Sequence, residues 1–125
     1  MGFFSNLRSA NTWKTGKSHA DNGNFEKALV YFDDSARMAT DQKTLYSHRL
    51  WYHLTKVVVY SKSGQMGDAK DSYKKFMDDL RGFKEECEKT PGIGTATRFN
   101  TTHNAILEFT ERNAQYVEPV ESSLS

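Results

Sequence analysis

Few residues in this 125-residue chain are of types that carry chemistry. The single cysteine, Cys87, has no second cysteine to pair with, which favours a reducing compartment and an inert, buried thiol. Of the four histidines, His48 and His53 are five positions apart, so a helix would separate them by about 140° around its axis. His19 and His103 are distant from both along the chain. The histidines therefore predict no metal site.

No catalytic motif can be assembled from the other polar residues. The sequence has no GxSxG nucleophile elbow, no HExxH zinc motif and no phosphate-binding glycine loop, and residues 92–94 are too short a glycine segment to count as one. The carboxylates are scattered along the chain. We therefore expect no enzyme activity, no catalytic residues and no cofactor, unless the fold brings two acids together in a buried pair.

Charge and hydropathy exclude other classes of function. The 17 basic and 16 acidic side chains give a net charge of +1, which is too small to steer the whole chain to nucleic acid or anionic lipid. The length suits one domain. The longest strongly apolar run, residues 57–60, is far shorter than the roughly 18 residues that cross a bilayer, and residues 1–13 show no secretory signal. We expect a cytoplasmic protein without a membrane partner.

Apolar residues recur at spacings of three and four, and period-two alternation is absent, which predicts an all-α protein. We expect five helices, at about residues 5–22, 25–39, 42–63, 66–89 and 95–117. The third is apolar around so much of its circumference that neighbours should cover it on two sides. The last places Phe99, Ile106 and Leu107 on one side. Residues 1–117 form one helical domain in this interpretation, and residues 118–125 form a flexible acidic tail.

An internal repeat relates the first four expected helices. The repeated residues are Gly23, Ala28 and Phe32, followed 41 positions later by Gly64, Ala69 and Tyr73. The glycines suit a left-handed helix end, and the alanines suit a close helix crossing. Gly16 costs its helix about 1 kcal/mol relative to alanine, so we expect a neighbouring helix to approach closely there. The repeat predicts two antiparallel helical hairpins, at about residues 9–40 and 42–90, and a terminal helix.

This pattern resembles the tetratricopeptide repeat family over about residues 9–81. The matching residues are Gly16, Gly23, Asn24, Phe25, Glu26, Ala28 and Phe32 in the first unit, and Gly64, Ala69 and Tyr73, with Met66 in place of Phe25, in the second. In the second unit Val57 and Gly67 depart from the pattern, and Thr40 stands where the family usually has proline. The period of 41 exceeds the usual 34 by nearly two helical turns, which preserves the buried face.

The resemblance implies a short right-handed array of hairpins that binds a peptide or a partner helix in a concave groove. By register, that groove would present Trp13, Lys14 and Lys17 from the first helix, and Trp51, Leu54, Thr55 and Val58 from the third. The basic and asparagine residues that grip a terminal carboxylate in chaperone-binding members are not reproduced, so we expect a contact anchored by aromatic residues. The implied function is that of a non-catalytic adaptor, chaperone-like protein or inhibitory binder.

Other interpretations remain open. Two units are fewer than the three that generally make a stable array, so a compact five-helix bundle, or a homodimer, is an alternative to an open array. An alternative to the groove is that both tryptophans belong to the core, in which case Trp51 is the stronger candidate for the core and Trp13 the stronger candidate for an interface. Arg8, Lys14 and Lys17 beside Trp13 could contact a nucleic acid, although three cations are few. Finally, Phe3, Phe4 and Leu7 either anchor the chain at a membrane surface or cover an end of the core.

Overall fold

The structure is a computed structural model that describes residues 2–89 and 92–124, and the side chains of residues 7–89, 92 and 94–124. Nearly all of this described chain is helical, and no strand occurs within it. The helices are α1 (Gly2–Asp21), α2 (Phe25–Met38), α3 (Gln42–Lys62), α4 (Met66–Lys89), α5 (Ile93–Arg112) and α6 (Ala114–Leu124). The all-α prediction is confirmed. No helix in the described part of the chain combines the length and the apolar character needed to cross a bilayer.

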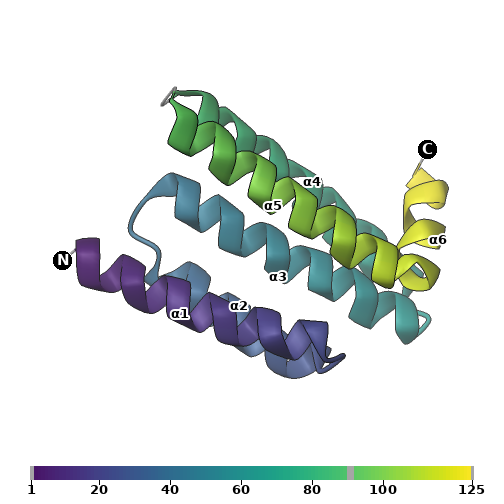
Figure 1. The fold of residues 1–125 in the computed structure, drawn as a ribbon. Coiled ribbons are helices and arrows are strands. Elements are labelled where there is room, and N and C mark those ends of the chain that lie inside the picture. The colour runs from purple at the N-terminus through teal and green to yellow at the C-terminus, as the bar shows by residue number, and fades with distance from the viewer. Residues whose placement is uncertain (1, 90–91, 125) are drawn as a thin grey trace.

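The first four helices form two antiparallel hairpins that pack side by side. α1 packs against α2, α3 against α4, and α2 against α3, so that α3 lies at the centre (Figure 1). α5 runs back along α4, and α6 contacts α3, α4 and α5 near the turn between α3 and α4 (Figure 1). The apolar circumference of α3 is therefore covered from several directions, as its sequence predicts.

The turns of the two hairpins share the same backbone hydrogen bonds. These are Asn24 N–H to His19 O (2.8 Å) and Gly23 N–H to Ala20 O (3.1 Å) in the first turn, and Gln65 N–H to Tyr60 O (2.9 Å) and Gly64 N–H to Ser61 O (3.1 Å) in the second. This is the Schellman motif, in which a glycine with positive φ ends the helix. Gly23 has φ 81° and Gly64 has φ 74°. The sequence repeat is therefore also a repeat of backbone structure.

Gly16 lies where α1 approaches α2 most closely. A Cβ atom at Gly16 would be 2.9 Å from Cδ1 of Phe32 and 3.0 Å from Cβ of Tyr31, which is closer than packed carbon atoms normally come. The close approach predicted at Gly16 is therefore confirmed. A second close approach, which the repeat does not predict, occurs at Gly82 in α4, where a Cβ atom would be 2.6 Å from the ring of Tyr46.

The core contains a chain of aromatic rings that joins both hairpins to α5. The ring of Trp51, only 1% exposed, lies 6.1 Å from Trp13, 6.3 Å from Phe32 and 5.6 Å from Phe109, between ring centroids. Phe109 also meets Phe25 edge to face at 6.4 Å. Aromatic pairs of this kind contribute about 0.5–1.5 kcal/mol each beyond the area that they bury. α5 therefore belongs to the same core as the hairpins.

The helix predicted at residues 95–117 is in fact two helices. α5 ends at Arg112 and α6 begins at Ala114. At the break between them, the side-chain amide of Asn113 donates to the carbonyl oxygen of Phe109 (2.9 Å). Asparagine side chains compete in this way with the backbone bonds that would continue a helix.

The prediction of a flexible tail is wrong for residues 118–124, because they are part of α6. Val117 and Val120, one turn apart, are buried at 1% and 0% exposure and hold α6 against the rest of the protein. Pro119 lies inside the helix and cannot donate to the carbonyl of Gln115, but both residues are exposed, so water can satisfy that carbonyl. The sequence-based prediction follows the acidic and proline-containing composition of this segment and overlooks the helical spacing of the two valines.

Candidate functional site

Four of the residues expected to line a partner groove, all of them in α3, are buried. Trp51 is 1% exposed, and Thr55 and Val58 are 0% exposed. The hydroxyl of Thr55 donates to the carbonyl of Trp51 within α3 (2.7 Å), so its polar group is also satisfied internally. Leu54, between them, is fully buried as well. This part of α3 is core, which corrects the expectation that Trp51, Thr55 and Val58 present a surface to a partner.

The chain's own α5 covers part of this face of α3, at Trp51. The ring of Phe109 stands edge-on to Trp51, at an interplanar angle of 89°. Near the end of α5, Arg112 donates to Asp21 of α1 (2.9 Å), which ties the helix to the first hairpin. At Trp51, the face that the resemblance assigns to a partner is therefore in contact with a helix of the same molecule.

The residues expected from α1 keep part of their exposure. The ring of Trp13 is partly buried and stacks on His48 (6.1 Å, 9°), and its Nε1 is buried with no hydrogen-bond partner. Lys17 forms an ion pair with Asp21 (2.7 Å) and lies 5.2 Å from the centre of the Trp51 ring. Lys14 is exposed. α1 therefore offers Lys14 and the edge of Trp13 rather than a continuous binding face.

The structure describes only some of the N-terminal side chains that the sequence suggests for contact with a nucleic acid or a membrane. Arg8 is exposed and lies one turn before a half-buried Thr12, while Lys17 is held by Asp21, so the three expected cations do not form one free patch. Leu7 is 48% exposed. The side chains of Phe3 and Phe4 lie outside the described residues.

A buried serine–histidine pair connects the first three helices. The Ser9 hydroxyl donates to the carbonyl of Ser35 in α2 (2.7 Å) and lies 3.0 Å from Nδ1 of His48 in α3. Because its proton is directed at Ser35, Nδ1–H must donate to the Ser9 oxygen, so this nitrogen cannot act as a base toward Ser9. Burial lowers the pKa of His48 to about 4, so the ring is neutral at pH 7. Ser9 is 0% exposed, and the arrangement suits a link between helices.

A second buried polar group lies between α3 and α4. Asp79 is 4% exposed, and its carboxylate lies 3.5 Å from Nε2 of His53 and 3.6 Å from the guanidinium of Arg49. Burial raises the pKa of Asp79, and burial lowers the pKa of His53 to about 4, so both shifts favour the neutral forms. Asp79 is the only carboxylate buried among the described residues, so no acid pair forms there. Within the same residues, no group of three metal-ligating side chains converges.

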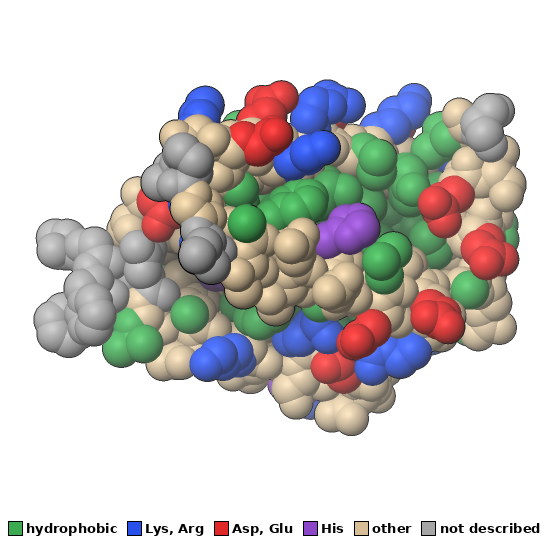
Figure 2. Space-filling model, turned by 45° about the horizontal axis from the view of Figure 1, so that its top comes forward, with side chains coloured by type: hydrophobic (Ala, Val, Ile, Leu, Met, Phe, Trp, Pro, Cys, Tyr) green, Lys and Arg blue, Asp and Glu red, His purple; other side chains and the backbone are tan. Residues whose placement is uncertain are grey.

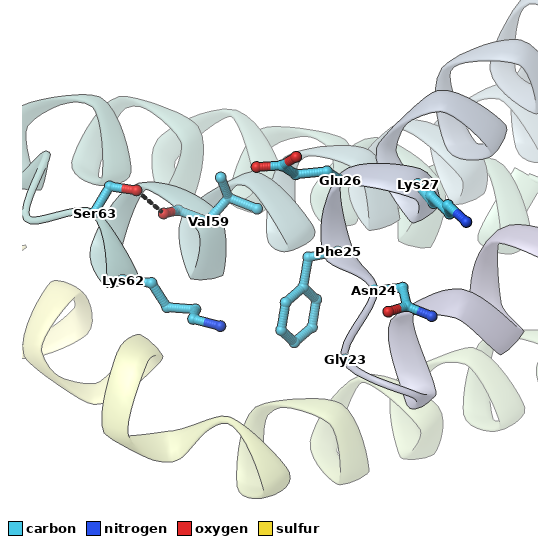
Figure 3. Close-up of a pocket in the computed structure, with 8 residues that line it drawn as sticks. All are labelled: Gly23, Asn24, Phe25, Glu26, Lys27, Val59, Lys62 and Ser63. Carbon is cyan, nitrogen blue, oxygen red and sulfur yellow. Dashed lines mark hydrogen bonds between the residues drawn. The ribbon is translucent and has the colours of Figure 1, made fainter.

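A hollow of about 360 Å³ lies beside the turn between α1 and α2 (Figure 3). Lys62 of α3 extends over the ring of Phe25 (5.3 Å) and also over Tyr116 of α6 (5.4 Å). Figure 3 shows Lys62 and Phe25 side by side, whereas Asn24 and Lys27 point away from them. The polar groups do not converge on one point, so the contacts of Lys62 serve to hold α6 near the first hairpin.

An apolar area on the outside of the protein lies between α4 and α5. We define the α4–α5 surface by Met77 and Leu80 of α4 and by Phe99, His103 and Leu107 of α5. Met77 is 40% and Leu107 is 52% exposed, His103 is exposed, and Leu80 and Phe99 are half-buried. His103 stacks on Phe99 (5.8 Å, 16°). Figure 2 shows hydrophobic side chains gathered in a band on this side of the molecule.

The α4–α5 surface continues into a hollow of about 510 Å³ near the end of α4. Lys84, Cys87 and Glu88 of α4 line one side of the hollow, and Ala96 and Phe99 of α5 line the other. Cys87 is 6% exposed, and burial raises the pKa of its thiol. The predicted inert thiol therefore lies beneath the edge of this surface. The aromatic floor continues inward, because Phe99 stacks on the fully buried Phe83 (5.8 Å).

Sequence reasoning alone does not mark the α4–α5 surface as a binding site. The helical pattern predicts Leu107 on the buried side of its helix, and its exposure corrects that expectation. The sequence does contain a sign that one apolar residue here would be exposed. Ile106 and Leu107 are adjacent, and a helix turns 100° from one residue to the next. Only one of the two can face the core fully, and Ile106, at 4% exposure, does so.

Comparison of the chain with protein-family models, curated proteins and solved structures finds no match. The basis for a functional proposal is therefore the geometry described above.

Proposed function

We propose that this protein is a non-catalytic protein-interaction module, built as a short tetratricopeptide-like array of two hairpins, that binds another protein through the α4–α5 surface. The observation that carries the proposal is the exposure of Met77 and Leu107 on both sides of the half-buried Leu80 and Phe99. Contiguous apolar areas of this kind usually mark interaction sites, whereas single exposed apolar residues are normal. Val30 of α2, at 60% exposure, is an example of the second kind.

The architecture supports the tetratricopeptide-like part of the proposal. The shared Schellman turns, the close approach at Gly16 and the complete burial of Ala28 and Ala69 are the features that such hairpins require. α5 then takes the place of a partner helix on the inner face, and binding moves to the outer side of α5. Two antiparallel helices that present an apolar groove offer a seat for a third helix packed along them.

The non-catalytic part of the proposal rests on the two buried polar groups. Each contains side chains that can act in catalysis, but Ser9, His48 and Asp79 are each at most 6% exposed. A substrate would have no access to them without separation of the helices. Their geometry fits helix-to-helix hydrogen bonding and ion pairing better than transfer of a proton to a ligand.

The proposal can be tested with two matched charge insertions. Leu107→Glu places a carboxylate on the α4–α5 surface, and Val30→Glu places one on an isolated exposed position of α2. We expect affinity capture from the native extract, with the chain as bait, to lose its bound proteins with Leu107→Glu and to keep them with Val30→Glu. Both variants should keep the helical circular dichroism spectrum. If Leu107→Glu captures the same proteins as the unaltered chain, the α4–α5 surface is not the binding site.

A further inference from the structure

We propose that the protein bound on the α4–α5 surface is a second copy of this chain. This inference rests on the proposed function, because it names the occupant of the same surface. It is drawn from the distribution of charge around the apolar residues, which makes the surface complementary to itself.

The long edge of the surface on α4 is basic. Its basic residues are Lys70, Lys74, Arg81 and Lys84, which follow one another at helical spacings on the same side of α4 as Met77. Arg81 is paired with the exposed Asp78 of the same helix (3.3 Å), so Lys70 and Lys74 carry the positive charge on which the proposal rests. Glu88 is the acidic residue at the far end of this edge. In Figure 2, Lys and Arg side chains lie along the upper border of the hydrophobic band, together with acidic side chains at its left part.

The opposite edge, on α5 and α6, is acidic. Glu108 and Glu111 are exposed near the end of α5, and Glu118 is exposed on α6. Figure 2 shows acidic side chains around the right end of the band, and both acidic and basic side chains below it. At the level of Lys74 the surface therefore has an apolar centre, a basic edge formed by Lys70 and Lys74, and an acidic edge formed by Glu108 and Glu111.

The pairing of α4 with α5 decides which charges would meet. The contact between Phe83 and Phe99 fixes the antiparallel register of the two helices. Moving nine residues from this contact, back along α4 and forward along α5, places Lys74 level with Glu108 and within one turn of Glu111. The basic and acidic edges are thus charged at the same height along the surface.

A two-fold axis parallel to α4 satisfies all three parts of the surface. Such an axis lays α4 of one copy over α5 of the other, so the apolar centres meet and Lys74 of each copy faces Glu111 of the other. A two-fold axis perpendicular to α4 in the same plane would instead place the basic edges on each other. A uniformly acidic partner helix would complement the basic edge alone, and a nucleic acid would be repelled by the acidic edge. The second copy is the occupant that pairs both edges.

The experiment is sedimentation equilibrium of the full chain at concentrations from about 1 to several hundred micromolar, a range that covers weak homodimers. We expect a monomer–dimer equilibrium that Leu107→Glu abolishes and Val30→Glu leaves unchanged. Lys74→Glu and Glu111→Lys should each weaken the dimer at least tenfold. The double variant should recover most of the affinity, because the pair is restored with its charges exchanged.

The outcomes separate this inference from the function on which it rests. A chain that stays monomeric over the whole range overturns the second-copy proposal, and the proposed function then stands or falls with the capture experiment on Leu107→Glu. A dimer that is unaffected by Leu107→Glu overturns the proposal as well, because the contact would lie elsewhere. A dimer that Leu107→Glu abolishes but that the charge exchange does not restore overturns the proposed two-fold arrangement.

Discussion

Gly16→Ala is the sharpest test of the hairpin packing, because it adds one carbon atom at the closest approach of α1 and α2. That carbon would lie 2.9 Å from Cδ1 of Phe32 and 3.0 Å from Cβ of Tyr31. Phe32 is 0% exposed and in contact with Trp13 and Trp51, so its ring cannot move without displacing the aromatic core. Overpacking of a core costs roughly 1–3 kcal/mol, and a rigid site belongs at the upper end of that range.

The helix propensity of alanine opposes this cost. Replacing glycine by alanine inside a helix contributes about 1 kcal/mol of stability. The net expectation for Gly16→Ala is therefore a loss of about 1–2 kcal/mol in the free energy of unfolding. Gly67→Ala is the matched control: Gly67 also lies in a helix, α4, but a Cβ atom added there would have no neighbour within 4 Å, so the propensity gain should appear alone.

The measurement is urea unfolding followed by circular dichroism at 222 nm for the unaltered chain and the two variants. We expect the urea midpoint to fall for Gly16→Ala and to rise for Gly67→Ala. In the second case the free energy of unfolding should rise by about 0.5–1 kcal/mol. Equal stabilisation by both substitutions would refute the close approach at Gly16. The slope with denaturant should be unchanged, which shows that both variants unfold from equally compact states.

Three further predictions concern buried groups. The lowered pKa of His48 means that the unfolded chain takes up a proton below about pH 6.5 while the folded chain does not until about pH 4, so the contribution of His48 to stability is complete above pH 6.5 and falls by roughly 3 kcal/mol as the pH drops to 4. Because the pKa of His53 is lowered to the same value, His48→Asn should reduce the pH dependence measured by urea titrations across that range without abolishing it, and an unchanged dependence would contradict the burial of His48. Cys87 should react with a thiol reagent such as DTNB many-fold more slowly in the folded chain than in urea, and equal rates would contradict its burial. Val120→Asp should release α6, seen as faster hydrogen exchange of its amides, whereas an unchanged exchange pattern would mean that α6 is not held by that side chain.

The features that could be predicted from sequence depend on neighbouring residues. Gly23 and Gly64 end their helices because positive φ is nearly cost-free only for glycine, and this requirement is visible in the local pattern. Local signals also indicate the bounds of α2, α3 and α4 to within about one turn. A glycine precedes α2 and α4, a capping residue precedes α3, and apolar periodicity runs through all three. Asp41, for example, caps α3 by accepting from the amide of Thr44 (2.7 Å).

The features that could not be predicted depend on contacts between distant residues. Helical register assigns Trp51 to the inner face of the hairpins, and its burial there depends on Trp13, Phe32 and Phe109, which are far away along the chain. Nothing in the local sequence of α3 indicates whether a partner or the chain's own helix covers that face. The same applies to the pair of Ser9 and His48, which only the packing of three helices brings within 3.0 Å.

α5 also restricts the insertion of a further hairpin between the two that it joins. Arg112 holds Asp21 of the first hairpin, while Phe109 sits against Trp51 of the second, so one rigid helix spans both units. Hairpin arrays usually lengthen by duplication of one unit, since each unit touches only its neighbours. Here a third hairpin spliced between the two would carry Asp21 beyond the reach of Arg112. Lengthening this array by evolution or by engineering would therefore require a longer α5 as well.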